Sequence, residues 1–111
     1  MINYLKKMRQ DKRDYREFKQ RVAALPAPYE QAMTSLEKYL WNLAGGDGAA
    51  MYTVLKNILD MFESAAADGV NVTQIVGDDL GVFADNLLEE FPEATWVNQE
   101  KTKLQRKAFK D

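Results

Sequence analysis

The residue types that are missing restrict the chemistry of this chain more than those that are present. Its 111 residues include no Cys and no His. Without Cys there is no disulfide, no thiolate nucleophile and no Cys-based zinc site. Without His there is no imidazole to act as a general base near neutral pH. Catalysis would have to use Asp, Glu, Lys, Tyr or a metal held by oxygen ligands, and we therefore expect a protein that is not an enzyme and has no cofactor.

Two aromatic residues close to a tight turn form the first candidate site. Tyr39 and Trp41 precede the glycine-rich segment 45–48, and together with Asp47 they could line a small pocket or an interface. Trp and Tyr are favoured at such sites because each combines a large apolar area with a polar tip. The alternative is ordinary core packing, with the indole and phenol groups hydrogen-bonded locally. Segment 45–48 lacks the Gly-Lys-Ser/Thr ending of a phosphate-binding loop, and it is better explained as the end of one helix and the start of the next, with Asp47 as N-cap.

The uneven distribution of charge gives the second candidate site. Residues 1–21 contain eight Lys/Arg against three acids, residues 22–99 two Lys against twelve acids, and residues 100–111 five Lys/Arg against two acids. The candidate nucleic-acid or partner patch consists of basic residues near the two ends: Arg9, Lys12, Arg13, Arg16, Lys103, Arg106 and Lys107. If both ends lie on one side of the molecule, they form a surface able to contact phosphates. The alternative is that the basic ends pair with the acidic middle.

A group of acids near residue 90 supplies oxygen atoms of the kind that Mg²⁺ and Ca²⁺ prefer. Its members are Asp85, Glu89, Glu90 and Glu93. The Asp-x-Asp-x-Asp-Gly rhythm of an EF-hand is missing, and Asp85 and Glu89 are simply four residues apart on one helix face. We therefore expect a solvated face and no metal site, with partner recognition as the alternative.

Helical spacing of apolar residues runs through nearly the whole chain, and no segment alternates as a half-buried strand does. A short N-terminal segment is predicted to end at a charged break, after which Asp11 or Asp14 caps a helix that ends before Pro26. Further helices are predicted from about residue 28 to 44 and from about 48 to 68. The second of these has the widest apolar arc, and we expect it at the centre of the fold.

The C-terminal part of the chain is predicted to form shorter helices. Residues 71–77 fit one or two helical turns capped by Asn71. Asp78 can cap the next helix, which Pro92 ends. A last helix, from about residue 93 to 109, has a sparse apolar stripe and is expected at the periphery.

These patterns predict an all-α fold, a compact helical bundle of about four main helices plus short ones, as a single helical domain over residues 1–111. No apolar run approaches the ~20 residues of a membrane-spanning helix. The N-terminus has no apolar stretch of signal-peptide length. We therefore expect a cytoplasmic protein that does not associate with a membrane.

Several motifs between about Lys12 and Phe91 resemble a bacterial family of small helical proteins of unknown function. The motifs are residues 12–16 with 21–26, 38–42 with 46–48, 59–63 with 65–69, and 76–80 with Phe83. Members of that family are sometimes labelled DNA-binding and ferritin-like, of the Dps type, and often occur beside PadR-type transcriptional regulators. The resemblance implies a fold and a genomic setting. It does not imply iron oxidation, because the Glu-x-x-His pairs of ferritin-type sites need a His.

The leading functional hypothesis is a non-enzymatic protein-interaction module, either self-associating as a dimer or accessory to a PadR-type regulator. It follows from the implied genomic setting, the missing catalytic residue types and the segregated charge. Direct DNA binding through the basic N- and C-terminal helices is the alternative. A small-molecule pocket near Trp41 is a third hypothesis.

Overall fold

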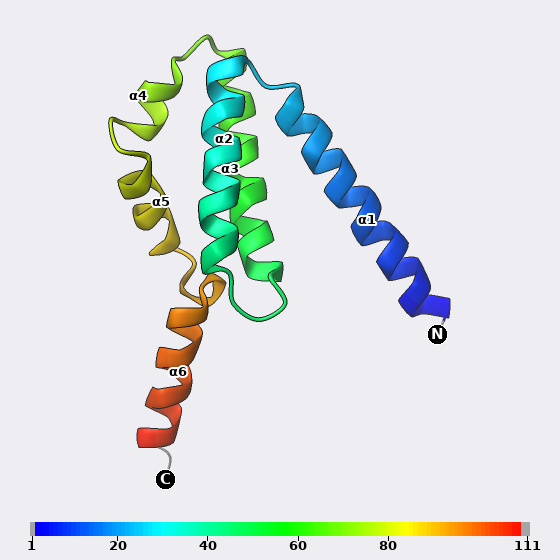
Figure 1. Ribbon diagram of the computed structural model, residues 1–111, viewed down its shortest axis with the longest axis vertical. Coiled ribbons are helices and arrows are strands. Elements are labelled where there is room, and N and C mark those ends of the chain that lie inside the picture. The colour runs from blue at the N-terminus through cyan, green and yellow to red at the C-terminus, as the bar shows by residue number, and fades with distance from the viewer. Residues whose placement is uncertain (1, 110–111) are drawn as a thin grey trace.

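A computed structural model describes residues 2–109, with the side chains of residues 4–109. The helices are α1 (Ile2–Ala23), α2 (Ala27–Leu43), α3 (Ala49–Ala67), α4 (Val72–Val76), α5 (Leu80–Leu88) and α6 (Trp96–Ala108), with a 3-10 turn, η1 (Pro92–Ala94), between the last two (Figure 1). Within the described range the only β-type pairing is an isolated bridge between Ala44 and Thr95. The expected all-α fold is confirmed.

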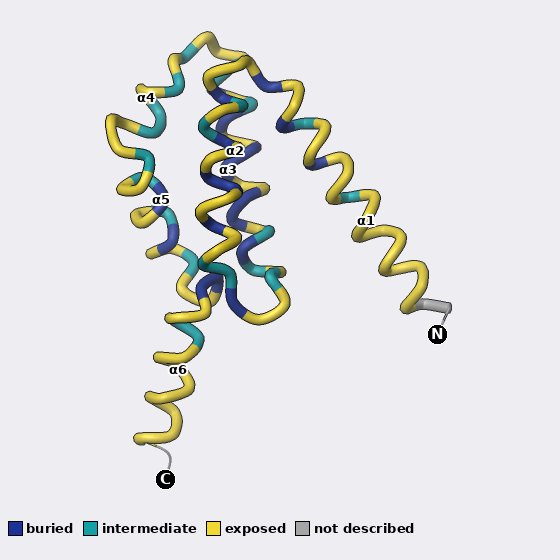
Figure 2. Tube along the Cα trace, viewed as in Figure 1, coloured by how far each residue is buried: buried dark blue, intermediate teal, exposed yellow. Residues whose placement is uncertain are grey.

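Helices α2 and α3 form an antiparallel hairpin that contains most of the hydrophobic core. Seven residues of α3 are buried at regular helical spacing: Met51, Val54, Leu55, Ile58, Leu59, Phe62 and Ala65. They pack against Tyr29, Met33, Leu36 and Leu40 of α2. Figure 2 shows the buried positions concentrated on these two helices. The wide apolar arc of α3 therefore does place it at the centre, as predicted.

Helix α1 covers one side of the hairpin with only its C-terminal half. The residues buried in the core are Phe18 and Val22 near the end of α1 and Leu25 just after it. Near the start of the helix, Tyr4 and Met8 are exposed. In Figure 1 the helix diverges from the hairpin toward its N-terminus. The first half of α1 therefore does not pack on the hydrophobic core of the hairpin.

The predicted break at Asp11 is wrong, because α1 is continuous from Ile2 to Ala23. The charged stretch contains no Gly or Pro, and its Lys, Arg, Gln and Glu residues are good helix formers. Neither Asp11 nor Asp14 caps a helix. Instead, Gln10 Nε2 donates a hydrogen bond to Asp14 Oδ1 at 3.0 Å, four residues along the same helix.

Helices α4 and α5 cover the opposite side of the hairpin. The backbone N–H of Asn71 donates to Gln74 Oε1 at 3.0 Å, in agreement with the predicted start of α4. The cap of α5 is Asp79, whose Oδ1 accepts the backbone N–H of Val82 at 3.0 Å, and not Asp78 as expected. Either acid fits the sequence pattern, but it is Asp79 that has the extended backbone of an N-cap residue (φ −129°, ψ 106°).

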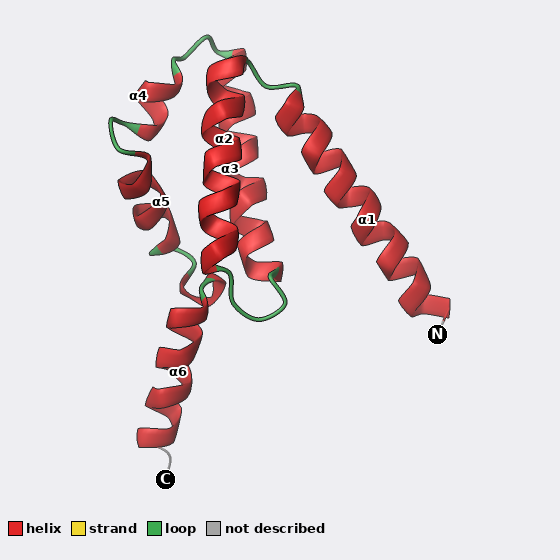
Figure 3. Cartoon of the chain, viewed as in Figure 1, coloured by secondary structure: helices red, strands yellow, loops and turns green. Residues whose placement is uncertain are grey.

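The start of α6 is attached to the turn between α2 and α3, the long loop at the lower end of the hairpin in Figure 3. The backbone N–H of Gly45 donates to the carbonyl of Ala94 at 3.0 Å. Only glycine fits here, because a Cβ on Gly45 would lie 2.8 Å from the backbone nitrogen of Trp96. The predicted start of the last helix near residue 93 is corrected: Glu93 belongs to η1, and Thr95 Oγ1 caps α6 by accepting from Asn98 N–H.

The molecule is flat and elongated, with extents of 54 × 42 × 20 Å. Its Cα radius of gyration is 16.4 Å, against about 13 Å expected for a compact domain of this length. The difference comes from the first half of α1 and from α6, which project from the core in different directions (Figure 1). No helix within residues 2–109 is long and apolar enough to cross a membrane.

Candidate functional site

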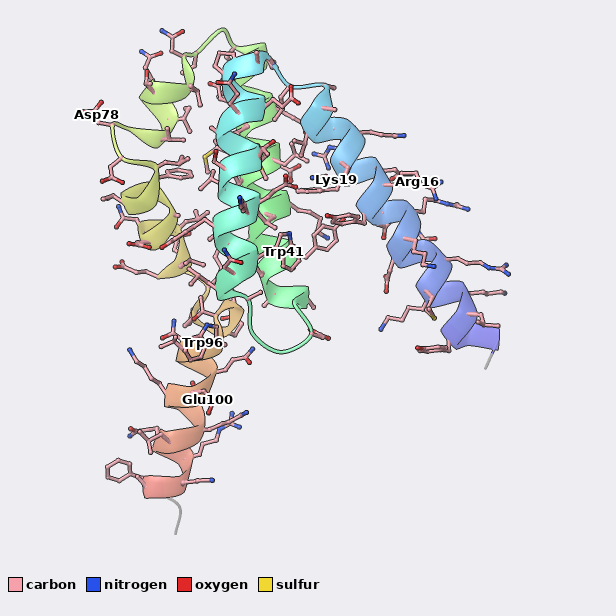
Figure 4. The ribbon with its side chains drawn as sticks, in the orientation of Figure 1. Arg16, Lys19, Trp41, Asp78, Trp96 and Glu100 are labelled. Atoms are coloured by element: carbon pink, nitrogen blue, oxygen red, sulfur yellow. The ribbon has the colours of Figure 1, made fainter. Side chains whose placement is uncertain are left out.

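Trp41 lies at the wide end of the wedge between α1 and the hairpin, on the side of α2 that faces α1 (Figure 4). A cleft of about 510 Å³ opens here. Its lining comes from α1, from the end of α2 and from the start of α3: Lys7, Asp11, Asp14, Tyr15, Trp41, Asp47, Gly48, Ala49 and Tyr52. The structure thus brings together two of the three residues predicted for a pocket, Trp41 and Asp47. We call this space the α1–turn cleft.

The turn at residues 45–48 positions Trp41 and Asp47 in the lining of the α1–turn cleft. Gly48 has a positive φ of 81°, and a Cβ there would lie 3.0 Å from Cζ3 of Trp41. Glycine at this position therefore lets the indole ring pack directly on the backbone. Asp47 precedes the N-cap residue, Gly48, instead of being the cap itself, and its Oδ1 accepts the backbone N–H of Ala49 at 2.9 Å.

Tyr39 does not belong to the α1–turn cleft. Side chains that are two residues apart on a helix point to nearly opposite sides, so Tyr39 and Trp41 face away from each other. The Tyr39 hydroxyl donates to Asp85 Oδ1 of α5 at 3.1 Å, and this hydrogen bond raises the pKa of Tyr39. Asp85 is thereby the one member of the predicted acidic group that contacts an aromatic candidate.

The basic residues predicted at the two ends of the chain are placed on two separate helices. Arg9, Lys12, Arg13 and Arg16 are exposed on α1, and Arg16 extends from the side away from the hairpin (Figure 4). Lys103, Arg106 and Lys107 are exposed on α6. Because the free ends of α1 and α6 project in different directions, the structure does not unite these residues into one patch (Figure 1).

Two other basic residues of α1 do pair with the acidic middle of the chain. Lys19 Nζ lies 3.1 Å from Oε2 of the buried Glu37. Arg21 Nη2 lies 2.6 Å from Asp60 Oδ1 and also binds Glu63. Hydrogen bonds to Glu63 and then to Asp60 raise the pKa of Arg21 above its usual range.

Charge pairing with the acidic middle is therefore confirmed for the C-terminal half of α1. The seven candidate patch residues differ, because among the described side chains none of them except Lys103 forms an ion pair. Lys103 Nζ lies 3.4 Å from Glu100 Oε1 on the same helix, and both side chains are largely exposed. The α1 and α6 ends carry basic charge that the rest of the described chain leaves mostly uncompensated.

Sequence reasoning missed the α1 and α3 walls of the α1–turn cleft, in particular Tyr15 and Tyr52. Their rings lie 6.2 Å apart between centroids. Both follow helical apolar patterns that look like plain core positions, and no local signal links two residues so far apart in the chain. Among residues 2–109, no three or more acidic side chains are grouped closely enough to hold a metal ion.

Comparison with known proteins gives a family and a fold. A crystal structure of a DUF1048 protein from Bacillus cereus ATCC 10987, described as a left-handed superhelix fold, is similar with a TM-score of 0.60 and 37% sequence identity. The match covers 66% of this chain and 90% of that one. No protein with curated annotation is detectably similar. The model of the DUF1048 family, described as proteins of unknown function, matches residues 6–109, and the chain therefore belongs to the DUF1048 family.

Proposed function

We propose that this protein is a non-enzymatic helical interaction module that docks α6 onto a protein partner. The observation that carries the proposal is that α6 is a well-formed, capped helix without a buried residue. Leu104 is 69% exposed and Val97 is 37% exposed, although both are apolar. An amphipathic helix that its own chain leaves uncovered is suited to binding in an apolar groove on another protein.

The charges of α6 define the chemistry of that partner. Val97, Leu104 and Ala108 lie on one stripe of the helix, from the 3.6-residue repeat. Lys101 and Lys107 border the stripe on its two sides, whereas Lys103 and Arg106 lie farther round the helix. A complementary groove would have an apolar floor and a carboxylate rim, because opposite charges direct the encounter and fix the register. We assign this role to a PadR-type transcriptional regulator, on the genomic setting that the resemblance implies.

The test is a titration of the purified chain with a purified PadR-type regulator, measured by isothermal calorimetry. We expect micromolar binding that Leu104→Glu weakens about tenfold or more, because a charge enters the apolar groove. Thr102→Glu is the matched control, because Thr102 is exposed on the side of α6 opposite Leu104 and the change of charge is the same; it should leave the affinity within about twofold.

Two results would contradict the proposal. If the regulator does not bind at micromolar concentration and the chain sediments as a monomer, α6 is not a docking helix. If the chain sediments instead as a dimer that Leu104→Glu dissociates, the occupant of the α6 face is a second copy and not the regulator.

The second candidate function is direct DNA binding, and the exposed bases of α1 favour it. Arg9, Lys12, Arg13 and Arg16 form no ion pair among the described residues, on a helix end that projects from the core. Duplex DNA should be retained at low salt and released when salt is added. Arg13→Glu and Arg106→Glu should each weaken this retention, whereas the control variant Lys38→Glu on α2 should not. Retention that is absent at low salt removes this function.

A further inference from the structure

The α1–turn cleft has an aromatic wall that its surroundings hold in place. The Tyr52 ring lies edge-on to the buried Phe18 ring at 5.5 Å between centroids and 6.2 Å from the Tyr15 ring. The Trp41 ring is fixed against Gly48. Three aromatic side chains from three helices thus line one space, and aromatic faces attract cations through their negative π-clouds. Lys56 Nζ, 4.6 Å from the centroid of the Tyr52 ring, already makes such a contact.

The charged residues of the α1–turn cleft are mostly acidic, although they lie beside the most basic helix of the chain. Asp11, Asp14 and Asp47 are in the lining, against the single basic residue Lys7. None of the three carboxylates forms an ion pair with a described Lys or Arg. Around α1, acids at positions 11 and 14 face the cleft, whereas Arg9 and Arg13 are absent from its lining.

The hydroxyl of Tyr52, a residue of the cleft lining, is itself unusual. Its oxygen is buried and has no hydrogen-bond partner among the described residues. Burial and then the nearby Asp14 carboxylate raise the pKa of Tyr52, so the group remains a neutral phenol with free acceptor lone pairs. A buried polar atom without a partner is uncommon in native proteins, and this one belongs to a residue of the cleft lining.

We propose that the α1–turn cleft binds an organic cation, an alkylammonium or guanidinium group. Its hydrocarbon part would lie against Trp41, Tyr15 and Tyr52, and its charge would face Asp11, Asp14 and Asp47. The same chemistry is offered by a free small cation and by a Lys or Arg side chain of another protein. The proposal does not depend on α6 or on a regulator, so its failure leaves the proposed function untouched.

Trp41 provides a direct signal for the test once the other tryptophan is removed. Trp96 is on α6, away from the cleft and half exposed, and Trp96→Phe leaves Trp41 as the only tryptophan. We expect saturable changes in Trp41 fluorescence with choline, or with the amides of Nα-acetyl-lysine and Nα-acetyl-arginine, which keep the charged side chain. Saturation with choline alone indicates a free cation as the natural ligand, and saturation with the amino-acid amides alone indicates a protein side chain. The neutral analogue of choline, 3,3-dimethylbutan-1-ol, has the same shape without the charge and should cause no saturable change.

Charge variants at exposed or half-exposed positions locate the site without endangering the fold. Asp11→Asn with Asp14→Asn should weaken cation binding about tenfold, because two of the three lining carboxylates lose their charge. Glu17→Gln on the same helix is the control: Glu17 is exposed and outside the cleft lining, and its removal should change the dissociation constant less than twofold. The proposal is overturned if no cation gives saturation, if the neutral alcohol binds equally well, or if Glu17→Gln weakens binding as much as the double variant.

Discussion

Helices α3 and α6 are equally regular, yet they relate to the rest of the chain in opposite ways. In α3, Met51, Val54, Leu55 and the next three core positions have no exposed surface. In α6 no residue is buried, and the hydrogen bond from Gly45 N–H to the Ala94 carbonyl attaches the segment just before its first turn to the hairpin. The sequence of α3 has an apolar arc wide enough to contact several neighbours, whereas the sequence of α6 has a stripe one or two residues wide. The difference teaches that helix formation and helix burial are separate properties of this chain.

The largest expected effect is in the centre of α3. Phe62→Ala should lower the free energy of unfolding by about 3–5 kcal/mol, because it leaves a cavity beside the Tyr29 ring at 5.2 Å and the Phe83 ring at 6.4 Å. Urea denaturation followed by circular dichroism measures it. A loss below about 1 kcal/mol would mean that α3 is not the centre of the core.

The junction between the two regions should be the next most sensitive position. Gly45→Ala places a Cβ 2.8 Å from the Trp96 backbone nitrogen and 2.7 Å from Gln99 Cδ, which we expect to cost about 1–3 kcal/mol. Hydrogen exchange should then accelerate in α6 and not in α3. Gly81→Ala on α5 is the control, where the nearest atom to the new Cβ is a side-chain oxygen of Asp79 at 3.2 Å. Equal protection of α6 in both variants would show that the junction tolerates a side chain.

Two tyrosines of the hairpin should respond differently to loss of their hydroxyl groups. Tyr29 Oη donates to the Val70 carbonyl at 2.6 Å, and Tyr29→Phe should cost about 1 kcal/mol because a partly buried acceptor loses its partner. The Tyr52 hydroxyl is buried without a partner, so Tyr52→Phe should leave the unfolding free energy unchanged or raise it slightly. Thermal melts of the two variants decide this, and a larger loss for Tyr52→Phe would reverse the assignment.

The smallest effect on stability is expected on the exposed helix, α6. Leu104→Ala should change the free energy of unfolding by less than about 0.5 kcal/mol, since the side chain is 69% exposed. Urea denaturation of the isolated chain measures this change. A loss above about 1 kcal/mol would show that α6 is covered in solution, either by its own chain or by another copy.

The hairpin could be predicted from sequence because its signals are local and agree with one another. The limits of α2 and α3 follow from Pro26 and from the glycine turn at residues 45–48, and the apolar spacing between these limits gives the buried face. Charged α1 was misjudged at Asp11, because capping residues also occur inside helices when the flanking residues favour helix. The choice between Asp78 and Asp79 depended on a backbone conformation that adjacent, identical residues cannot reveal.

The candidate sites could be predicted only in part, because their geometry depends on packing between distant segments. Trp41 and Asp47 are close in the chain and do share the α1–turn cleft. Tyr39 is just as close but points to α5, a consequence of helical periodicity that the residue types alone do not show. Tyr15 and Tyr52 meet only through the packing of α1 on α3, and the separation of the basic ends follows from the directions in which α1 and α6 leave the core.

Because α6 is attached near its first residue, a small rotation there moves its free end by a larger distance. Its 13 residues correspond to a length of about 20 Å at 1.5 Å per residue, with the pivot at the contact between Gly45 and Ala94. A rotation of about 10° at this pivot moves the far end of the helix by roughly 3 Å. The same turn continues into Gly48, on which the ring of Trp41 packs, so the pivot of α6 and one edge of the α1–turn cleft belong to a single loop.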